Sequence, residues 1–246
     1  MKDFRADLHI HSVLSPCGDL DMSPRNIIRH AVDSQIDILG ITDHNSTRHG
    51  PLMRKLGSEH GVFVLTGAEV TSREEVHCLA FFETDDQLAS FQEYLDKKLI
   101  PFKNDPGRFG HQVVVDKNDN IVDEVENLLI YSIDQGIDQI EEMVHSLEGL
   151  FIPAHVNRAI NSIFSQLGFM PSGINADALE ISRHVGKKDF LEGHPDLSHF
   201  TFIQSSDAHF PGDIGRVSSV FRIKEVNFGE IKMALARKEG RRVVSP

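Results

Sequence analysis

The chain has 246 residues, a length that suits one barrel-sized α/β domain better than two small ones. Hydrophobic residues make up 40% and charged residues 25%, as in ordinary globular proteins, and no apolar run approaches the roughly 20 residues that span a bilayer. The formal net charge of −12 argues against general electrostatic attraction to nucleic acid or anionic lipid, so we expect no membrane partner and do not favour extended nucleic acid.

The start of the chain, MKDFRADLHIHS, lacks the apolar segment of a signal peptide. Its two cysteines, Cys17 and Cys78, cannot build a disulfide framework. We therefore expect a cytoplasmic protein whose stability comes from packing or from bound metal. The sequence gives no indication of the oligomeric state.

Short strand-like runs alternate with helical stretches along most of the chain. Strands are predicted at residues 3–10, 36–42, 62–70, 77–82, 150–156, 177–182, 201–207 and 219–223. Helices are predicted at residues 24–35, 85–99, 137–149 and 227–240, the first of them opened by the N-cap pair Ser23 and Pro24. This alternation predicts an α/β protein with a largely parallel sheet, folded as a single domain over residues 1–246.

The alternation is interrupted at about residues 100–148. The stretch IPFKNDPGRFGHQVVVDKNDN is rich in turn formers and charge, and two helical segments follow it. Because regular β and α units flank this region, we expect an insertion, with the character of a lid, and not a separate domain.

Acids and histidines gather at the ends of the predicted strands, where the chain has much of its complement of 14 histidines. In an α/β barrel the carboxyl ends of parallel strands meet at one mouth, so these side chains are expected to meet there. The candidates at strand ends are His9, His11, Asp43, His44, Glu69, His77, His155, Asp207 and His209. Imidazoles and carboxylates together are ligands for Zn²⁺, Mn²⁺ or Fe²⁺, and a set of this size predicts two or three ions with Glu69 as a bridge. Such sites activate water for phosphoryl or acyl hydrolysis.

The motifs DLHIHS, GITDHN, GAEVTS, EVHCLAFF, PAHV and SSDAH resemble, in order and approximate spacing, those of the PHP (polymerase and histidinol phosphatase) family of metal-dependent phosphoesterases. The resemblance runs from about residue 5 to residue 210. It implies a distorted (β/α)7 barrel with a trinuclear metal site at its mouth. Carried over by position, it implies the metal ligands His9, His11, His44, Glu69, His77, His155, Asp207 and His209, with Asp207, His209 and Glu69 closest to the reaction.

One position departs from the family pattern. Where many members have an Asp or His five or six residues after the second histidine, this chain has Pro16 and Cys17. Either Cys17 ligates as a thiolate, or Asp19 reaches in from a longer loop. We predict Asp19, because a carboxylate suits the rest of the oxygen and nitrogen shell.

Several further residues have assigned or open roles. Asp43 and Asp7 are either ligands or acceptors that orient a ligand, Glu180 is expected to act behind the ligands, and His184 is a weaker candidate for the mouth.

A phosphatase also needs cations for the substrate's phosphate. We predict Arg158 and Arg183 for this role, followed by Arg108 and Arg73.

The leading hypothesis is a metal-dependent phosphoesterase, a hydrolase that acts on a small phosphorylated metabolite or nucleotide through metal-activated water. A nuclease or exonuclease is the first rival hypothesis, although the charge of −12 and the lack of clustered basic and aromatic residues speak against a long polymer. The same ligand set is compatible with hydrolysis of a C–N bond, and with a metal-stabilised binding module that has no catalytic activity.

Overall fold

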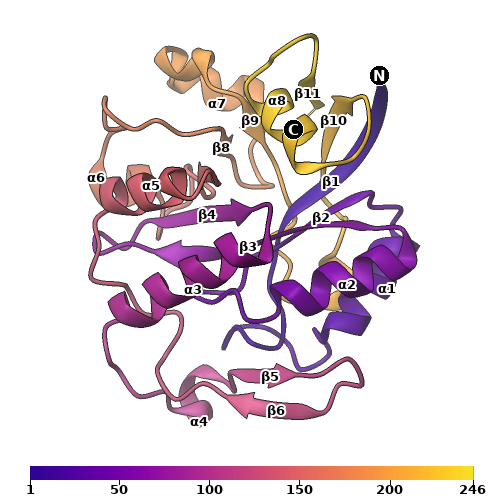
Figure 1. Ribbon diagram of the computed structural model, residues 1–246. Helices are drawn as coiled ribbons and strands as arrows, with labels where there is room; N and C mark the ends of the chain where they lie inside the picture. Colours follow the sequence, from indigo (N-terminus) through magenta and orange to yellow (C-terminus); the bar gives the residue numbers. More distant parts are fainter. Residues whose placement is uncertain (246) are drawn as a thin grey trace.

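The computed structural model describes residues 1–245, in which a curled seven-stranded sheet is the main feature (Figure 1). Strands β1 (Lys2–Ile10), β2 (Ile38–Ile41) and β3 (Phe63–Thr71) are parallel neighbours, and β4 (His77–Phe82) and β7 (Leu150–Pro153) follow with antiparallel pairing. On the other edge of β1, β10 (Ser219–Ile223) and β11 (Arg242–Ser245) pair antiparallel.

Two short strands close the sheet into a barrel. Strands β8 (Leu179–Glu180) and β9 (Phe202–Ile203) are parallel to each other, and the hydrogen bond from Val156 N to Glu180 O, 2.8 Å, joins β8 to the end of β7. Beyond β9, Ala208 forms a parallel bridge with Ile10 of β1. The ring β1, β2, β3, β4, β7, β8, β9 is a distorted (β/α)7 barrel, as the sequence predicts.

The sheet is less parallel than predicted, because β4, β10 and β11 run against their neighbours. The short turn at residues 72–76 joins β3 to β4, and a connection of this length can only link antiparallel strands. As a result, Thr71 at the end of β3 pairs with His77 at the start of β4. His77 therefore lies at the same end of the barrel as the carboxyl ends of β1 to β3.

Helices cover the outside of the barrel, and most of the predicted ones are present. They are α1 (Pro24–Asp33), α2 (Gly50–His60), α3 (Asp85–Lys98), α4 (Pro106–Phe109), α5 (Ile137–Ser146), α6 (Ile163–Leu167), α7 (Lys187–Gly193) and α8 (Phe228–Leu235), with the 3-10 turns η1 (Pro195–His199) and η2 (Pro211–Asp213). Side chains cap several of them: Ser23 accepts from the N–H of Asn26, and Thr84 and Gln87 form a capping box. No helix among residues 1–245 is both long and apolar enough to cross a bilayer.

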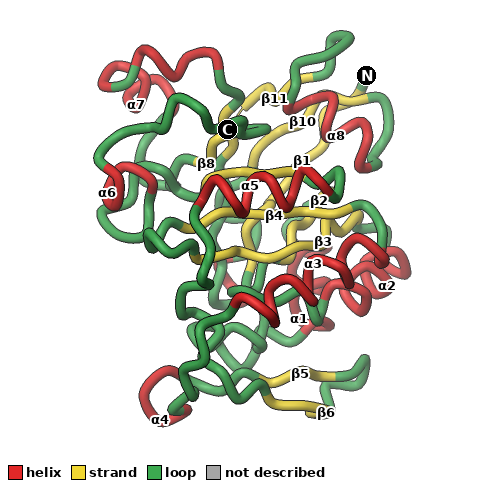
Figure 2. The backbone as a smooth tube through the Cα atoms, turned by 60° about the vertical axis from the view of Figure 1, so that its left-hand side comes forward, coloured by secondary structure: helices red, strands yellow, loops and turns green. Residues whose placement is uncertain are grey.

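Apolar side chains fix these helices to the sheet. Ile27 and Ile28 of α1 pack with Ile41 of β2, and Ile140 of α5 packs with Phe151 of β7 in a second cluster. Figure 2 shows α5 running alongside β4. Burial of such side chains stabilises by about 1.5–3 kcal/mol each relative to exposure, so the barrel holds its polar mouth on a rigid base.

The segment at residues 100–135 carries α4 and a hairpin of β5 (Val113–Val115) and β6 (Ile121–Glu124), below the barrel in Figure 1. Val113 and Val115 pack on Val13, in the loop that follows β1. Farther on, α5 lies in the outer layer of the barrel against β4 and β7. The hairpin is thus attached to a loop that borders the barrel mouth.

Candidate metal centre

Polar side chains from strands far apart in the sequence meet at the mouth of the barrel. They are His9, His11, His44, Glu69, His77, His155, Asp207 and His209. The six from His9 to His155 are buried, whereas the side chains of Asp207 and His209 keep about a quarter of their surface, 25% and 24%. The structure thus brings together all of the ligands that the family resemblance implies.

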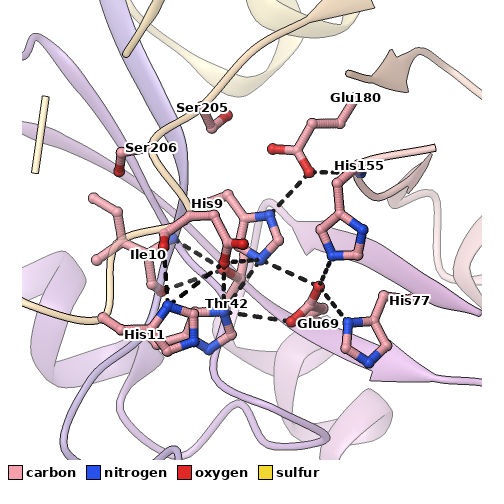
Figure 3. Close-up of polar contacts among 12 residues, drawn as sticks. His9, Ile10, His11, Thr42, Glu69, His77, His155, Glu180, Ser205 and Ser206 are labelled. Atoms are coloured by element: carbon pink, nitrogen blue, oxygen red, sulfur yellow. Dashed lines mark hydrogen bonds and ion pairs between the residues drawn. The ribbon is translucent and has the colours of Figure 1, made fainter. Parts of the chain in front are cut away.

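Glu69, at the end of β3, is the centre of this cluster, and Figure 3 shows His9, His77 and His155 around it. Its Oε1 lies 2.9 Å from His77 Nδ1, 3.1 Å from His155 Nε2 and 3.3 Å from His9 Nε2. Its Oε2 lies 3.2 Å from His44 Nδ1 and 3.4 Å from His11 Nε2. A carboxylate with imidazoles on both oxygens has the geometry of a bridging ligand.

Hydrogen bonds behind His9 and His11 settle which ring nitrogens are free. The Nδ1 of His9 donates to Oε2 of Glu180, 2.9 Å, and the same oxygen accepts from the N–H of His155. The Nδ1 of His11 donates to Oγ of Ser15, 3.0 Å, because that hydroxyl gives its own proton to Asp43. Both rings therefore turn Nε2 toward the cluster.

The same holds for His209, whose Nδ1 donates to the backbone oxygen of Asp207, 2.9 Å. Asp207 has a φ of 52° and His155 a φ of 29°. Both values are positive, in the left-handed region that residues other than glycine rarely adopt. Two strained backbones at one mouth are typical of a site whose side-chain positions matter more than local backbone energy.

The arrangement fits a cation. The Nε2 atoms of His9 and His11 lie 3.1 Å apart, and each lies 3.5 Å from Oδ1 of Asp207, so imidazole nitrogens and carboxylate oxygens face one small space. The Nδ1 of His44 is buried and has no hydrogen-bond partner, although it lies 3.2 Å from Oε2 of Glu69. Imidazole nitrogens and carboxylate oxygens gathered in this way form a donor set that suits Zn²⁺, Mn²⁺ or Fe²⁺.

The charges of the cluster's side chains also favour a bound cation. Burial alone would raise the pKa of Glu69, but His77, His9 and His44 outweigh it and hold that pKa well below its usual value. Burial lowers the pKa of His9, yet Glu180 and Glu69 raise it well above the usual range. Burial also lowers the pKa of His209, to about 4. The carboxylates stay charged at neutral pH and attract positive charge into the cluster.

Asp43 lies behind the cluster, in contact with Ser12 and Ser15. It accepts from the backbone N–H of Ser12, 2.6 Å, from the Ser12 hydroxyl, 2.7 Å, and from the Ser15 hydroxyl, 2.8 Å. Behind Ser12, His49 contacts its Oγ through Nδ1, 2.7 Å, and accepts from the N–H of Val115 through Nε2, 3.0 Å. This chain of hydrogen bonds links the hairpin of residues 113–124 to His11.

Asp7 holds the loop that carries Asp207. Its two oxygens accept from the N–H of Ser206, 2.9 Å, and of Gly215, 2.8 Å, and burial raises its pKa to about 6. Glu180 likewise lies behind the cluster, where its Oε2 contacts His9 Nδ1 and the backbone N–H of His155.

A cavity of about 250 Å³ opens beside the cluster, next to Asp207 and His209. Of the four predicted arginines, Arg158 and Arg183 line it; Arg158 donates to Oδ2 of Asp207, 2.7 Å, and Arg183 to the backbone oxygen of Ser206, 3.4 Å. Its lining also includes His184. The cavity is therefore lined by both cationic and acidic side chains.

The remaining two predicted arginines lie elsewhere. Arg73 pairs with Asp134, 3.2 Å, on the turn between β3 and β4, and Arg108 stacks on the ring of Phe109 in α4. Neither lines the cavity. This geometry does not support their predicted role in binding the substrate's phosphate.

The structure also separates the two candidates of the loop after β1. Asp19 uses Oδ1 to accept from the N–H of Asp21, 2.8 Å, and is absent from the clusters of ligand atoms found among the described residues. Cys17 belongs to one of these clusters, with His11, His44 and His209. The preference for Asp19 is thus not supported by this geometry, because its side chain closes a turn of its own loop.

Comparisons with known proteins agree with this fold. No family model matches the chain. Uncharacterized protein YqxK of Bacillus subtilis is 24% identical over 100% of this chain and 65% of the relative, and uncharacterized protein MJ1587 of Methanocaldococcus jannaschii is 40% identical over 78 residues, 28% of this chain and 46% of the relative. The chain thus spans less than two thirds of either curated relative.

Among solved structures, the lesion-specific Endonuclease Q of Pyrococcus furiosus superimposes with a TM-score of 0.74 and 23% identity, over 98% of this chain and 58% of that chain. A provisionally assigned metal-dependent phosphoesterase of Bifidobacterium adolescentis has a TM-score of 0.64 and 17% identity, over 94% and 96%. These neighbours share the barrel fold of this chain.

Proposed function

We propose that this chain is a PHP-type, metal-dependent phosphoesterase that hydrolyses a small phosphorylated metabolite or nucleotide. The observation that carries the proposal is the cage of imidazoles around Glu69, placed beside a cavity that Arg158 and Arg183 line. The carboxylates would hold divalent cations and the neighbouring arginines would bind phosphate oxygens, a combination that suits a phosphorylated ligand.

The residues that would hold two or three divalent ions are the eight of the cluster, with Glu69 shared. When bound, ions such as Zn²⁺, Mn²⁺ or Fe²⁺ would lower the pKa of water and neutralise charge that develops on the phosphoryl oxygens. Glu180, Ser15 and Asp43 keep the ligand rings in one tautomer and one orientation. The chain's contribution is thus a site that is organised before substrate arrives.

Arg158 and Arg183 would bind the phosphate, since a guanidinium matches its oxygens in charge and geometry. His184, which also lines the cavity, is our candidate for donating a proton to the leaving oxygen, because it is not one of the residues around Glu69. His209, whose pKa burial lowers to about 4, is neutral near pH 7 and is assigned to ligation.

A nuclease is the second candidate. Endonuclease Q, which shares this fold at 22% identity and a TM-score of 0.74, has been crystallised with a 27-mer duplex that has an abasic lesion at its active site. The charge of −12 and a cavity of about 250 Å³ favour a smaller substrate for this chain. A short strand or a nucleotide end fits such a cavity better than a continuous duplex.

Phosphate release tests the proposal. Purified protein is assayed with Mn²⁺ or Zn²⁺, and with chelator, on sugar phosphates, histidinol phosphate, mononucleotides, bisphosphonucleotides, single-stranded DNA and abasic duplex. Metal-dependent turnover of a small monoester, lost in Asp207→Ala, supports the main proposal, and cleavage of DNA alone replaces it with the nuclease. Silence of metal-loaded protein across the panel contradicts both and directs attention to C–N substrates or a binding role.

A further inference from the structure

Another cavity, of about 340 Å³, lies among α7, β9, β11 and the turn that follows α8, elements that gather at the top of Figure 1. Its cationic lining residues are Lys187, Arg237, Arg241 and Arg242, and among the described residues no aspartate or glutamate lines it. It shares no lining residue with the cavity beside the metal cluster. Four cations around one space are a local reversal of charge in a chain whose formal net charge is −12.

Acidic side chains neutralise one of these four cations. Arg241 is 4% exposed, and its guanidinium pairs with Glu230, 2.7 Å, and with Glu239, 2.7 Å. Its Nε donates to the second oxygen of Glu230, 3.1 Å, so the two groups meet side by side. Arg241 therefore serves as a fixed wall of the cavity, and its charge is already matched.

The other three cations have no such partner. No ion pair found within residues 1–245 involves Lys187, Arg237 or Arg242. Arg237 donates from Nε to Oγ1 of Thr201, 3.0 Å, and from Nη2 to the backbone oxygen of Phe200. These acceptors are neutral, so they orient the guanidinium without cancelling its charge.

Lys187, at the start of α7, is half-buried, and its Nζ lies over the ring of Phe202, 5.5 Å from the centroid. Burial, and the like charge of Arg237, lower the pKa of Lys187. An anion between the two cations would offset both effects, because it would pair with the ammonium group and separate it from the guanidinium.

The turn that carries Arg237 is built at some cost to its backbone. Arg237 has a φ of 55° and Glu239 a φ of 49°, values that residues other than glycine rarely adopt, and Gly240 follows with a φ of 80°. The turn directs Arg237 to β9 and Arg241 to Glu230. Strain of this kind is typical of positions where a side chain must be held in one place.

We propose that this cavity binds the phosphate group of a small anion, held by Lys187, Arg237 and Arg242, with the hydroxyl of Ser198 on the same lining as a further donor. The inference goes beyond the proposed function, since this site lies apart from the metal cluster and does not depend on hydrolysis there. Guanidinium and ammonium groups together match phosphate oxygens in charge and geometry. The volume suits a phosphate with a small organic group attached, and the overall charge of −12 disfavours a long nucleic acid.

Amide NMR spectra of the full chain test the proposal, with inorganic phosphate, a nucleoside phosphonate that cannot be hydrolysed, and a short single-stranded DNA as probes. The backbone amides of Thr201 and Gly240, both on the lining, should shift in a saturable way with phosphate or with the phosphonate. The stronger of the two probes tells whether free phosphate or a phosphorylated metabolite is the better ligand. Lys187→Gln and Arg237→Gln should each weaken this binding about tenfold, since each removes a hydrogen bond to a charged group.

Lys188→Gln and Lys238→Gln are the matched controls, because each removes one positive charge next to the site from a residue that does not line the cavity. Both should keep the wild-type affinity, and so should Arg158→Ala, which changes the cavity at the mouth. Amides that do not move with either small probe, or equal losses in Lys187→Gln and Lys188→Gln, overturn the inference. Shifts produced by DNA alone replace the small anion with a nucleic acid. None of these results depends on turnover, so phosphate release at the mouth tests the proposed function separately.

Discussion

The Nδ1 of His9 donates to Oε2 of Glu180 over 2.9 Å, although the two residues are 171 positions apart. The contact joins β1 to β8 across the barrel and leaves Nε2 of His9 turned to the cluster. The same carboxylate oxygen accepts from the N–H of His155. One acid therefore positions two of the imidazoles that surround Glu69.

Glu180→Gln should weaken metal binding without unfolding the protein. The amide keeps the shape but loses the negative charge that holds His9 in its tautomer, and losses of about 10–100-fold in metal affinity are typical for such partners. Competitive titration of Zn²⁺ against a chromophoric chelator measures the change. Glu93→Gln, on the exposed face of α3, is the control; an unchanged affinity in Glu180→Gln would contradict this role.

Ser15→Ala should cost both stability and metal. The Ser15 hydroxyl accepts from His11 Nδ1 and from the N–H of His44 and donates to Asp43, so its removal leaves buried donors without a partner. Each costs about 1–3 kcal/mol, and we expect a loss of about 2 kcal/mol in the free energy of unfolding. Urea denaturation of the metal-free protein measures it, with Ser90→Ala on exposed α3 as the control. Equal stabilities for the two variants would rule out this role.

Arg158→Ala should raise KM for a phosphorylated substrate about 10–100-fold, because a hydrogen bond to a charged group contributes about 1.5–3 kcal/mol. Arg158 lines the cavity and contacts Asp207, whereas Arg73 pairs with Asp134 outside it. Arg73→Ala is thus the matched control and should leave KM unchanged. Steady-state kinetics on the substrate identified by phosphate release measure KM for both variants. Equal changes of KM in the two variants would remove Arg158 from the phosphate site.

His145 on α5 predicts a pH dependence away from the mouth. A hydrogen bond from its Nε2 to Asp177, 3.1 Å, raises the pKa of His145 in the folded protein. A raised folded pKa stabilises the fold fully below the unfolded value of about 6.5, and the stabilisation is lost as the pH rises through the folded pKa.

His145→Gln should therefore lower the free energy of unfolding at pH 5.5 on the order of 0.5 kcal/mol more than at pH 8.5. Denaturant curves of the metal-free protein at both pH values measure this difference. His60→Gln, at the exposed end of α2, is the control. A larger destabilisation at pH 8.5 than at pH 5.5 would reverse the sign and reject the assignment.

The barrel and the strand-end histidines could be predicted because their signals are local. His9 and His11 lie at the carboxyl end of one predicted strand and Glu69 near the carboxyl end of another, so strand prediction alone places them at the same edge. Helix α2 was not predicted, since Gly50, Pro51 and Gly57 give it low helix propensity; packing of Met53 and Leu56 holds it instead.

Contacts between residues far apart in the sequence could not be predicted from the sequence. His49 lies in a region predicted as loop, yet the structure buries it between Ser12 and the N–H of Val115, 66 residues away. The choice between Cys17 and Asp19 depends on how one turn closes, which the sequence does not specify. Phe210 lines the cavity and is 55% exposed. Its position directly after the SSDAH motif could have identified it from the sequence as a residue of the site.

The measurement that tests the central claim most directly is the metal content of the wild-type protein and of Glu69→Gln after the same incubation with Zn²⁺ and removal of free ions. We predict two to three equivalents per wild-type chain and a loss of at least one in the variant, with the fold retained by circular dichroism. A metal content that is unchanged in Glu69→Gln, or a wild-type chain that retains no metal, would contradict a Glu69-centred metal site.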